Sequence, residues 1–396
     1  MAYRMRMSFR LVSLAAACAA LVLSGCSGTG EVPPGLQRPE HGHTSQATLT
    51  PKPVPTTPAR KGESFTTVTM PAAYAPKAPT KSGTDEYRCF LIDPGFTQDM
   101  HVSGVDIQPG NPALVHHVIV FQAAPSQLAQ AKKLDAAEPG DGWTCFGGSG
   151  LDRSRGGNLD DAGWVGAWAP GGGERVLPAD IAIPLAKGTQ LVVQMHYNLL
   201  GGTGTDQSAV RLRVTPAATS TKEPLRTLLL PAPVELPCRP DKPGQLCNRL
   251  MAIANIKARF QEEITTADLL HAMCGPIKPG PVQSCTRTIR EATTLRAVAG
   301  HMHLLGRAIT IDVNKGTEKA KRVLDITNWD FDNQATKALP KPVKLVPGDT
   351  LTVTCTHDQS LRDRLPAFKG QPERYVAWGE GTTDEMCLGI VLATGA

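Results

Sequence analysis

Short apolar runs separated by glycine- and proline-rich turns recur from about residue 84 onward, and they restrict the fold more than any other feature. Each run has about the length of one or two strands. In chain order they are YRCFLI, ALVHHVIVFQ, TQLVVQMHYNLL, AVRLRV, TLRAVAGHMHLLGRAITIDV, DTLTVTCT and CLGIVLA. Many short strands with regular turn signals are typical of a β-sandwich or a jelly roll. We therefore predict a mainly β protein.

One stretch departs from this pattern. In NRLMAIANIKARFQEEITTADLLHAMC, residues 248–274, the apolar residues fall at helical spacing, and TTADLL supplies a helix start near Thr266. We expect a helical hairpin inserted into a β domain. A chain of 396 residues is long for one core, and the polar stretch PAATSTKEP favours a domain boundary near residue 218.

The first 26 residues predict export. Three arginines precede an apolar run that is too short to favour a spanning helix and that ends in small residues. The ending LSGC resembles a bacterial lipobox, whose cysteine is lipidated and becomes the mature N-terminus. An ordinary cleavage site with an incidental cysteine is the alternative. We expect 1–26 to be a lipoprotein signal peptide, with Cys26 anchoring an exported protein to the outer side of the cytoplasmic membrane or to the outer membrane.

A polar segment follows the signal peptide. Residues 27–83 hold ten prolines and many threonines, so they cannot bury enough apolar surface to offset their ordering entropy. We expect a disordered tether, in which His41 and His43 are solvated. The net charge of +5 includes no dense basic tract, so no nucleic-acid partner is expected.

The cysteines indicate a disulfide framework. Ten are present, and eight remain after the two in the signal peptide are set aside, which suits an exported protein. Four of them flank the helical stretch. In an antiparallel hairpin, Cys247 would pair with Cys274, and Cys238 with Cys285. Sequential pairing, 238 with 247 and 274 with 285, stays open.

Histidines occur in pairs within the expected strands. GHMHLLGRAITI, residues 300–311, places His301 and His303 one residue apart, so a regular strand would project both from one face. Two such imidazoles are costly as charges and useful as a chelate. Adjacent His116 and His117 in LVHHVIVF would point to opposite faces, so a shared ion requires the strand to end or bulge there. VVQMHYN places His196 on another strand.

A methionine adds a soft donor. GTTDEMCLGIVLA places Met386 beside Cys387 at the start of a strand, where a core methionine is the ordinary explanation. Imidazole suits copper, zinc, iron and nickel, whereas a thioether selects Cu(I). A His-His-Met set therefore favours copper over zinc.

Taken in order, HHVIVF, VQMHYN, HMHLLG and DEMC resemble the motifs of the copper type II ascorbate-dependent monooxygenases, which include peptidylglycine α-hydroxylating monooxygenase and dopamine β-hydroxylase. The resemblance runs from about residue 87 to the C-terminus. It implies two tandem jelly-roll domains, 84–217 and 218–396, the second with a small disulfide-stapled helical insert over 238–285. It also implies two copper ions per chain that face each other across a solvent-filled cleft.

The resemblance implies a role for each ligand residue. An electron-storing copper would lie on His116, His117 and His196, and the catalytic, oxygen-activating copper on His301, His303 and Met386. The implied reaction hydroxylates a C–H bond with O₂ and two electrons from ascorbate or another small reductant. Two disulfides are implied as well, one joining Cys89 to Cys145 and one joining Cys355 to Cys387.

The substrate clamp of the peptide hydroxylase is missing. The Arg, Asn and Tyr that bind the substrate carboxylate in that enzyme correspond here to Ala299, Leu388 and Ile390. A buried carboxylate would meet no donor at these positions, so peptide amidation is not expected. No acidic residue is assigned to an ammonium, which leaves amine hydroxylation unsupported. We expect a small, fairly apolar organic substrate.

Two other histidines have structural explanations. We expect His357 at a strand end on the surface, and His271 either packed or facing solvent within the helical stretch. The leading hypothesis is thus a lipid-anchored copper monooxygenase. Its alternatives are a copper-binding or copper-buffering surface lipoprotein without turnover, and a structural β-sandwich with incidental histidines. The six intact ligand types argue against the last of these. The sequence predicts no oligomeric state.

Overall fold

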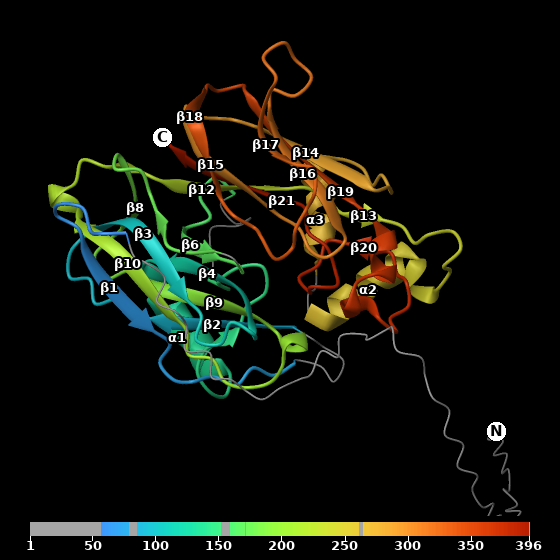
Figure 1. The fold of residues 1–396 in the computed structure, drawn as a ribbon, viewed down its shortest axis with the longest axis horizontal. Helices are drawn as coiled ribbons and strands as arrows, with labels where there is room; N and C mark the ends of the chain where they lie inside the picture. Colours follow the sequence, from blue (N-terminus) through green and yellow to red (C-terminus); the bar gives the residue numbers. More distant parts are fainter. Residues whose placement is uncertain (1–56, 79–84, 152–158, 171, 261–263, 396) are drawn as a thin grey trace, which may run out of the picture. The chain divides into compact units, whose positions relative to one another are not determined.

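The structure is a computed structural model (Figure 1). It describes residues 57–78, 85–151, 159–170, 172–260 and 264–395. These residues belong to one compact unit, Pro53–Ala396. The expected signal peptide, its Cys26, and His41 and His43 lie outside the described residues. Among the described helices, none has the length and apolar character needed to cross a membrane.

Two sheets come from the first half of the described chain. The six-stranded sheet contains β1 (Ser64–Thr69), β10 (Ala209–Pro216), β3 (Met100–Gln108), β8 (Ile181–Leu185) and β11 (Glu223–Pro224) in that order, with β7 (Arg175–Val176) also paired to β3. The five-stranded sheet has the order β5 (Trp143–Thr144), β2 (Asp85–Ile92), β9 (Gln190–Asn198), β4 (Val115–Ala123) and β6 (Trp164–Trp168). Side chains from one face of each sheet, such as Val102 and Val118, share one buried apolar core.

Two further sheets come from the second half. One has the order β12 (Arg226–Pro231), β21 (Leu388–Thr394), β15 (Thr293–His301) and β18 (Lys337–Leu345). The other has the order β14 (Val282–Thr288), β19 (Thr350–His357), β16 (Gly306–Val313) and β17 (Lys321–Ile326), and a short pair joins β13 (Glu235–Leu236) to β20 (Val376–Ala377). Val298, Ile309 and Val353 belong to the core that these sheets share. The prediction of a mainly β protein is confirmed.

Helices are few in the described residues. They are α1 (Leu128–Ala137), α2 (Arg249–Phe260) and α3 (Thr266–Cys274), with 3₁₀ turns at Pro125–Gln127, Leu199–Gly201, Ala217–Thr219, Gln245–Cys247, Gln359–Asp363 and Pro366–Phe368. The helix start expected near Thr266 is present, because the Thr265 hydroxyl accepts a hydrogen bond from the amide of Asp268 at 3.2 Å. Ile253 and Leu270 join the core of the second half, which explains the apolar spacing of this stretch.

Four disulfides are formed in the described chain. Those implied by the family resemblance, Cys89–Cys145 and Cys355–Cys387, are present. Around α2 and α3 the pairing is sequential, Cys238–Cys247 and Cys274–Cys285, so the nested arrangement is wrong. The reason is that each bridge closes a short local loop at one end of the helical region.

The expected tether extends too far toward the C-terminus. Residues 64–69 form β1, which pairs antiparallel with β10 along its whole length. Glu63, just before β1, forms an ion pair at 3.0 Å with Arg213, whose side chain is fully buried. The sequence SFTTVT has good strand propensity, but the proline-rich composition of its surroundings hid this signal.

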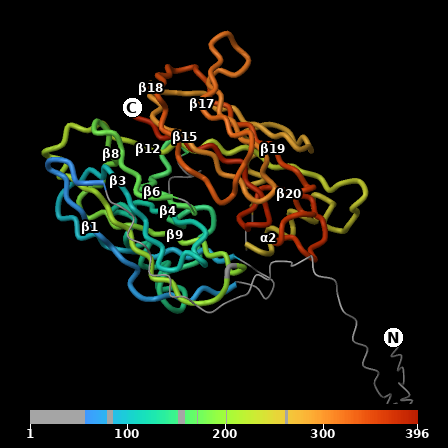
Figure 2. The backbone as a smooth tube through the Cα atoms, in the orientation of Figure 1, coloured from blue at the N-terminus to red at the C-terminus, as the bar shows by residue number. Residues whose placement is uncertain are grey.

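The outer faces of two sheets lie against each other. The tube view shows β4 and β6 beside β12 and β15 (Figure 2). Residues 159–162 connect the two halves along β12: the amide of Ala162 donates to the carbonyl of Thr227 and the amide of Leu229 to that of Leu159, both at 2.8 Å. The sheets carrying the predicted ligands are thereby brought together.

Candidate metal centre and cavity

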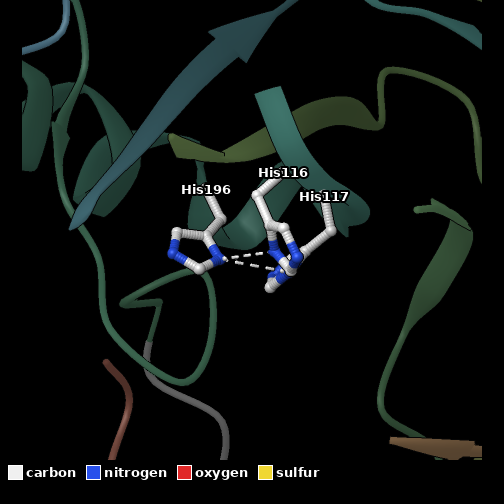
Figure 3. Close-up of side chains that lie close together, drawn as sticks. All are labelled: His116, His117 and His196. Atoms are coloured by element: carbon white, nitrogen blue, oxygen red, sulfur yellow. Dashed lines mark hydrogen bonds between the residues drawn. The ribbon is translucent and has the colours of Figure 1, made fainter. Parts of the chain in front are cut away.

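A bulge in β4 brings three histidines to one point. The β4–β9 register shifts between Val115 and His117, so that His117 lies opposite His196 and His116 is the extra residue. The bulge that a shared ion requires is therefore present. Figure 3 shows the three rings with Nδ1 atoms turned toward one another. These atoms are separated by 3.3 Å for His116–His117, 3.3 Å for His116–His196 and 3.2 Å for His117–His196.

Protons alone cannot satisfy this triangle of nitrogens. A ring nitrogen of a neutral imidazole is either a donor or an acceptor, so at least one of the three contacts joins two donors or two acceptors. A cation at the centre would accept all three lone pairs. That centre lies about 1.9 Å from each nitrogen, close to the distance of about 2.0–2.1 Å at which imidazole binds zinc. The donor set fits a metal ion.

Neighbouring side chains orient these ligands. Nε2 of His196 donates to Oδ1 of Asp85 at 2.9 Å, which leaves the Nδ1 lone pair free for a metal. Tyr87 stacks on His196 with ring centroids 4.1 Å apart, and Phe331 stacks on His116 at 4.4 Å. The sequence analysis missed Asp85, Tyr87 and Phe331, because only the fold brings them to the histidines.

Burial keeps the candidate ligands neutral. Desolvation, followed by the charge of His196, lowers the pKa of His116 to about 2, and the same causes lower the pKa of His117 well below its ordinary value. Burial also lowers the pKa of His301 to about 3 and lowers that of His303. A neutral imidazole keeps the lone pair that a metal needs, so these rings are in their metal-binding form at neutral pH.

His301 and His303 meet at the end of β15. Their ring centroids are 5.2 Å apart. However, β15 ends at His301, and the chain turns before β16 begins at Gly306. The expectation that both project from one regular strand is therefore wrong. The reason is the buried Glu385 carboxylate, which accepts hydrogen bonds from the amides of His303, at 3.0 Å, and Leu305, and so stabilises the turn.

The second set of candidate ligands, His301, His303 and Met386, also contains buried ring nitrogens without hydrogen-bond partners among the described residues. Nδ1 of His301 donates to Oε1 of Gln334 at 2.6 Å, which leaves Nε2 with its lone pair. His303 is only 1% exposed, and neither of its ring nitrogens has a partner among the described residues. Such a buried polar group costs about 1–3 kcal/mol unless something binds it. Met386 is buried as well, and it lines the same cavity as His301.

His357 does not lie on the surface as expected. It is 2% exposed, and its Nε2 contacts the carbonyl oxygen of Met386 and Oε2 of Glu385, each at 3.2 Å. The disulfide of Cys355 and Cys387 places the end of β19 beside the start of β21, which explains this burial. His271 packs within the helical region, bonded to Glu235 at 2.7 Å.

The two histidine sets are neighbours. The rings of His117 and His301 have centroids 5.7 Å apart, and Phe331 lies between the sets, with its centroid 6.4 Å from that of His303. No wide cleft separates these two rings, in contrast to the cleft that the resemblance implies. The sets therefore border a common space.

A cavity of about 600 Å³ opens beside both sets. From the five-stranded sheet it is lined by Tyr87, His117, Ile119, Phe121, Trp164 and Gln194, and from the opposing sheet by Leu229, Pro231, Ala299, His301, Leu388 and Ile390. On β4, β12, β15 and β21 these residues occupy every second position, so each of these strands turns one face to a core and the other to the cavity. The three positions that lack the peptide clamp thus form part of an apolar wall.

A β protein with a candidate histidine metal centre beside a largely apolar cavity is the class that the fold and site define. Residues 282–392 match the family model described as copper type II ascorbate-dependent monooxygenase, C-terminal domain. The family model and the curated relatives described next support the copper type II ascorbate-dependent monooxygenase family for this chain.

Two curated proteins are similar to the chain. MOXD1 homolog 1 of Drosophila melanogaster is 24% identical over 332 residues, which cover 77% of this chain and 39% of that protein. Putative DBH-like monooxygenase protein 2 of Homo sapiens is 35% identical over 89 residues, which cover 22% of this chain and 16% of that protein. The match thus spans less than half the length of either relative.

Solved structures add nothing to this assignment. The structure of allantoicase matches 72% of this chain and 76% of its own chain at 12% identity, with a TM-score of 0.19. So low a score carries no argument about fold or function.

Proposed function

We propose that the chain is a copper-dependent monooxygenase that hydroxylates a C–H bond of a small organic substrate, using O₂ and a reductant such as ascorbate. The observation that carries this proposal is the meeting of two buried histidine sets at the wall of a largely apolar cavity of about 600 Å³. Copper buffering requires ligands but no substrate-sized cavity beside them. The cavity therefore favours an enzyme over the alternative, a copper-binding lipoprotein without turnover.

The proposal includes two copper ions per chain. One would be held by His116, His117 and His196, and the other by His301, His303 and Met386. Imidazoles suit copper, and a thioether favours its reduced state. When bound, copper supplies the one-electron chemistry with O₂ that side chains lack. The balanced reaction converts R–H, O₂, two electrons and two protons to R–OH and water.

The side chains around the ligands have positioning roles in this proposal. Asp85 and Gln334 each accept a hydrogen bond from one ring nitrogen, which fixes the other nitrogen as a ligand. Tyr87 and Phe331 cover the imidazole faces and keep water from them. The apolar walls bind the substrate body and orient one C–H bond toward the second ligand set, which faces the cavity through His301.

The domain and anchoring expectations remain part of the proposal. Two sheet pairs with largely separate cores support tandem jelly-roll domains over 84–217 and 218–396. The N-terminal sequence supports export and a lipid anchor at Cys26, which would tie the protein to a membrane through the segment that precedes β1.

Oxygen uptake tests the activity. The full chain, loaded with copper and supplied with ascorbate, is assayed against a panel of small apolar compounds, and ¹⁸O₂ traces the oxygen into the product. We expect substrate-dependent uptake with one labelled oxygen atom per product. His301→Ala should abolish it. His101→Ala is the matched control, because His101 bonds Ser220 outside the site. Copper binding without coupled product formation over the whole panel would favour the buffering protein.

A further inference from the structure

The cavity contains one cationic side chain among the residues that the structure describes. Arg175, on β7, lines it together with Trp164 and Trp168 of β6. Its Nη2 donates to the carbonyl oxygen of Val165 at 3.1 Å, which holds the guanidinium beside β6. The sequence analysis gave this arginine no role, because nothing in its local sequence marks it.

This guanidinium has no counter-ion in the described chain. Its neighbour Glu174 is engaged elsewhere, with Oε1 2.9 Å from Nη2 of Arg213. No described carboxylate offsets the burial of Arg175, and desolvation alone lowers its pKa to about 10. Arg175 is partly buried, and a partly buried charge without a partner is unfavourable. A guanidinium carries five N–H donors, and the bond to Val165 uses only one of them.

Among the described residues, the acidic side chain that lines the cavity is that of Glu380, and it lies at the other end of the cavity from Arg175. The hydroxyl of Tyr87, on β2, donates to the carbonyl of Glu380 at 2.7 Å, which places Glu380 over β2. In the sheet, β9 and β4 separate β2 from β6. Three inter-strand spacings of about 4.8 Å put these ends about 14 Å apart. An anion beside Arg175 would therefore be remote from Glu380, and His117 on β4 lies between the two ends.

We infer that Arg175 binds a carboxylate of the substrate, so that the natural substrate is a small organic acid with an apolar body. This inference rests on the proposed function and names its substrate class. The planar fork of the guanidinium pairs with a carboxylate through two hydrogen bonds. The apolar body then extends across β4, between the tryptophans and the opposing wall, toward His301 and Met386. The hydrogen-bond donor for the carboxylate would thus come from β7. Ala299, Leu388 and Ile390, the positions compared with the peptide hydroxylase, offer no donor.

Calorimetric titration of the full, copper-loaded chain without reductant tests the inference. The probes are phenylpropionate and its uncharged amide, phenylpropionamide. We expect the acid to bind about tenfold or more tightly than the amide, as hydrogen bonds to charged groups imply. Arg175→Met should remove the preference for the acid over the amide, whereas Arg175→Lys should keep part of it. Arg290→Met, which removes an exposed arginine outside the cavity, is the matched control.

Several outcomes would overturn the inference. Equal or undetectable binding of the two probes to the wild type would do so, whatever the variants show. A preference for the acid that survives in Arg175→Met would assign the carboxylate to copper or to another residue. The result is independent of turnover: a preference lost with Arg175 but no oxygen uptake would count against the proposed function alone.

Discussion

The imidazole rings of His117 and His301 lie 5.7 Å apart, although they come from different halves of the chain. His117 follows the bulge of β4, and His301 is the last residue of β15. The contact places the two ligand sets at one wall of the cavity. In the proposed function, an electron that moves from one histidine set to the other would cross only the short distance between these two rings.

Metal content should distinguish the two sets. The wild type should bind two copper ions per chain, and His116→Ala should bind one, because the triangle of Nδ1 atoms loses a corner while His301, His303 and Met386 remain. Elemental analysis after dialysis measures this, with His101→Ala as the control that keeps two. One ion in the saturated wild type, or a preference for zinc under reducing conditions, would show that the second set is misassigned.

Met386→His should change the preferred oxidation state and the oxygen reactivity of copper bound by the second ligand set. The variant supplies a harder ligand of adequate size, so copper should stay bound, shift toward Cu(II), and turn over oxygen far more slowly. X-ray absorption of the reduced wild type should show a copper–sulfur contribution that disappears in the variant. If the sulfur signal persists in Met386→His, or is missing from loaded wild type, then Met386 is a core residue.

Asp85→Ala should weaken copper binding at the His116, His117 and His196 set and leave binding at the other set unchanged. Removing the acceptor of His196 Nε2 frees the ring to rotate and to change tautomer. We expect a loss of about 10–100-fold in affinity at the triad, typical of such partners. Competition with a chelator measures it, and Asp241→Ala, at an exposed aspartate, is the control. An unchanged affinity in Asp85→Ala would mean that stacking by Tyr87 alone orients His196.

Acid should weaken the attachment of residues 57–63 through Glu63. Burial would raise the pKa of this carboxyl, but hydrogen bonds from Ser103, the Arg60 amide and Arg213 lower it to about 2. Because the folded pKa lies below the unfolded value, the stabilisation is complete above about pH 4.5 and is lost as the pH falls toward 2. It amounts to about 3 kcal/mol.

Urea unfolding of the wild type and of Glu63→Gln at pH 7, 4 and 3 measures this effect. The difference in the free energy of unfolding between the two proteins should shrink steadily as the pH falls. A constant difference over this range would assign the stabilisation to shape and neutral hydrogen bonds.

Cys26→Ser should release the protein from the membrane fraction and leave its copper content unchanged. The physical reason is that the anchor precedes the folded residues and contributes no ligand. Fractionation of cells followed by metal analysis measures both properties. A variant that stays with the membrane would favour a different mode of attachment.

The candidate ligand residues could be singled out from the sequence because they occur in short patterns. HH, HMH and DEMC place donors at fixed spacings, and the need for a bulge at His116 follows from strand geometry alone. Asp85 and Gln334 could not be predicted, because they reach His196 and His301 through pairing between segments far apart in the chain.

Two wrong predictions have specific physical causes. His303 lies in a turn because Glu385, 82 residues away, accepts hydrogen bonds from the backbone there. Spacing alone does not reveal such a bond. The pairing of Cys238 with Cys247 depended on where the helices end relative to their flanking loops, and the sequence left both pairings open.

The bulge at His116 also changes what an apolar pattern means. Val115 and Val118 are both buried in the same core, although residues three apart on a regular strand face opposite ways. Three-residue apolar spacing is ordinarily read as helix. Within a strand, the pattern of one apolar residue, two histidines and a second apolar residue can instead indicate a β-bulge. The bulge places the two histidine side chains close together. A scan of other β sequences for this quartet would be a simple means of finding unrecognised metal centres.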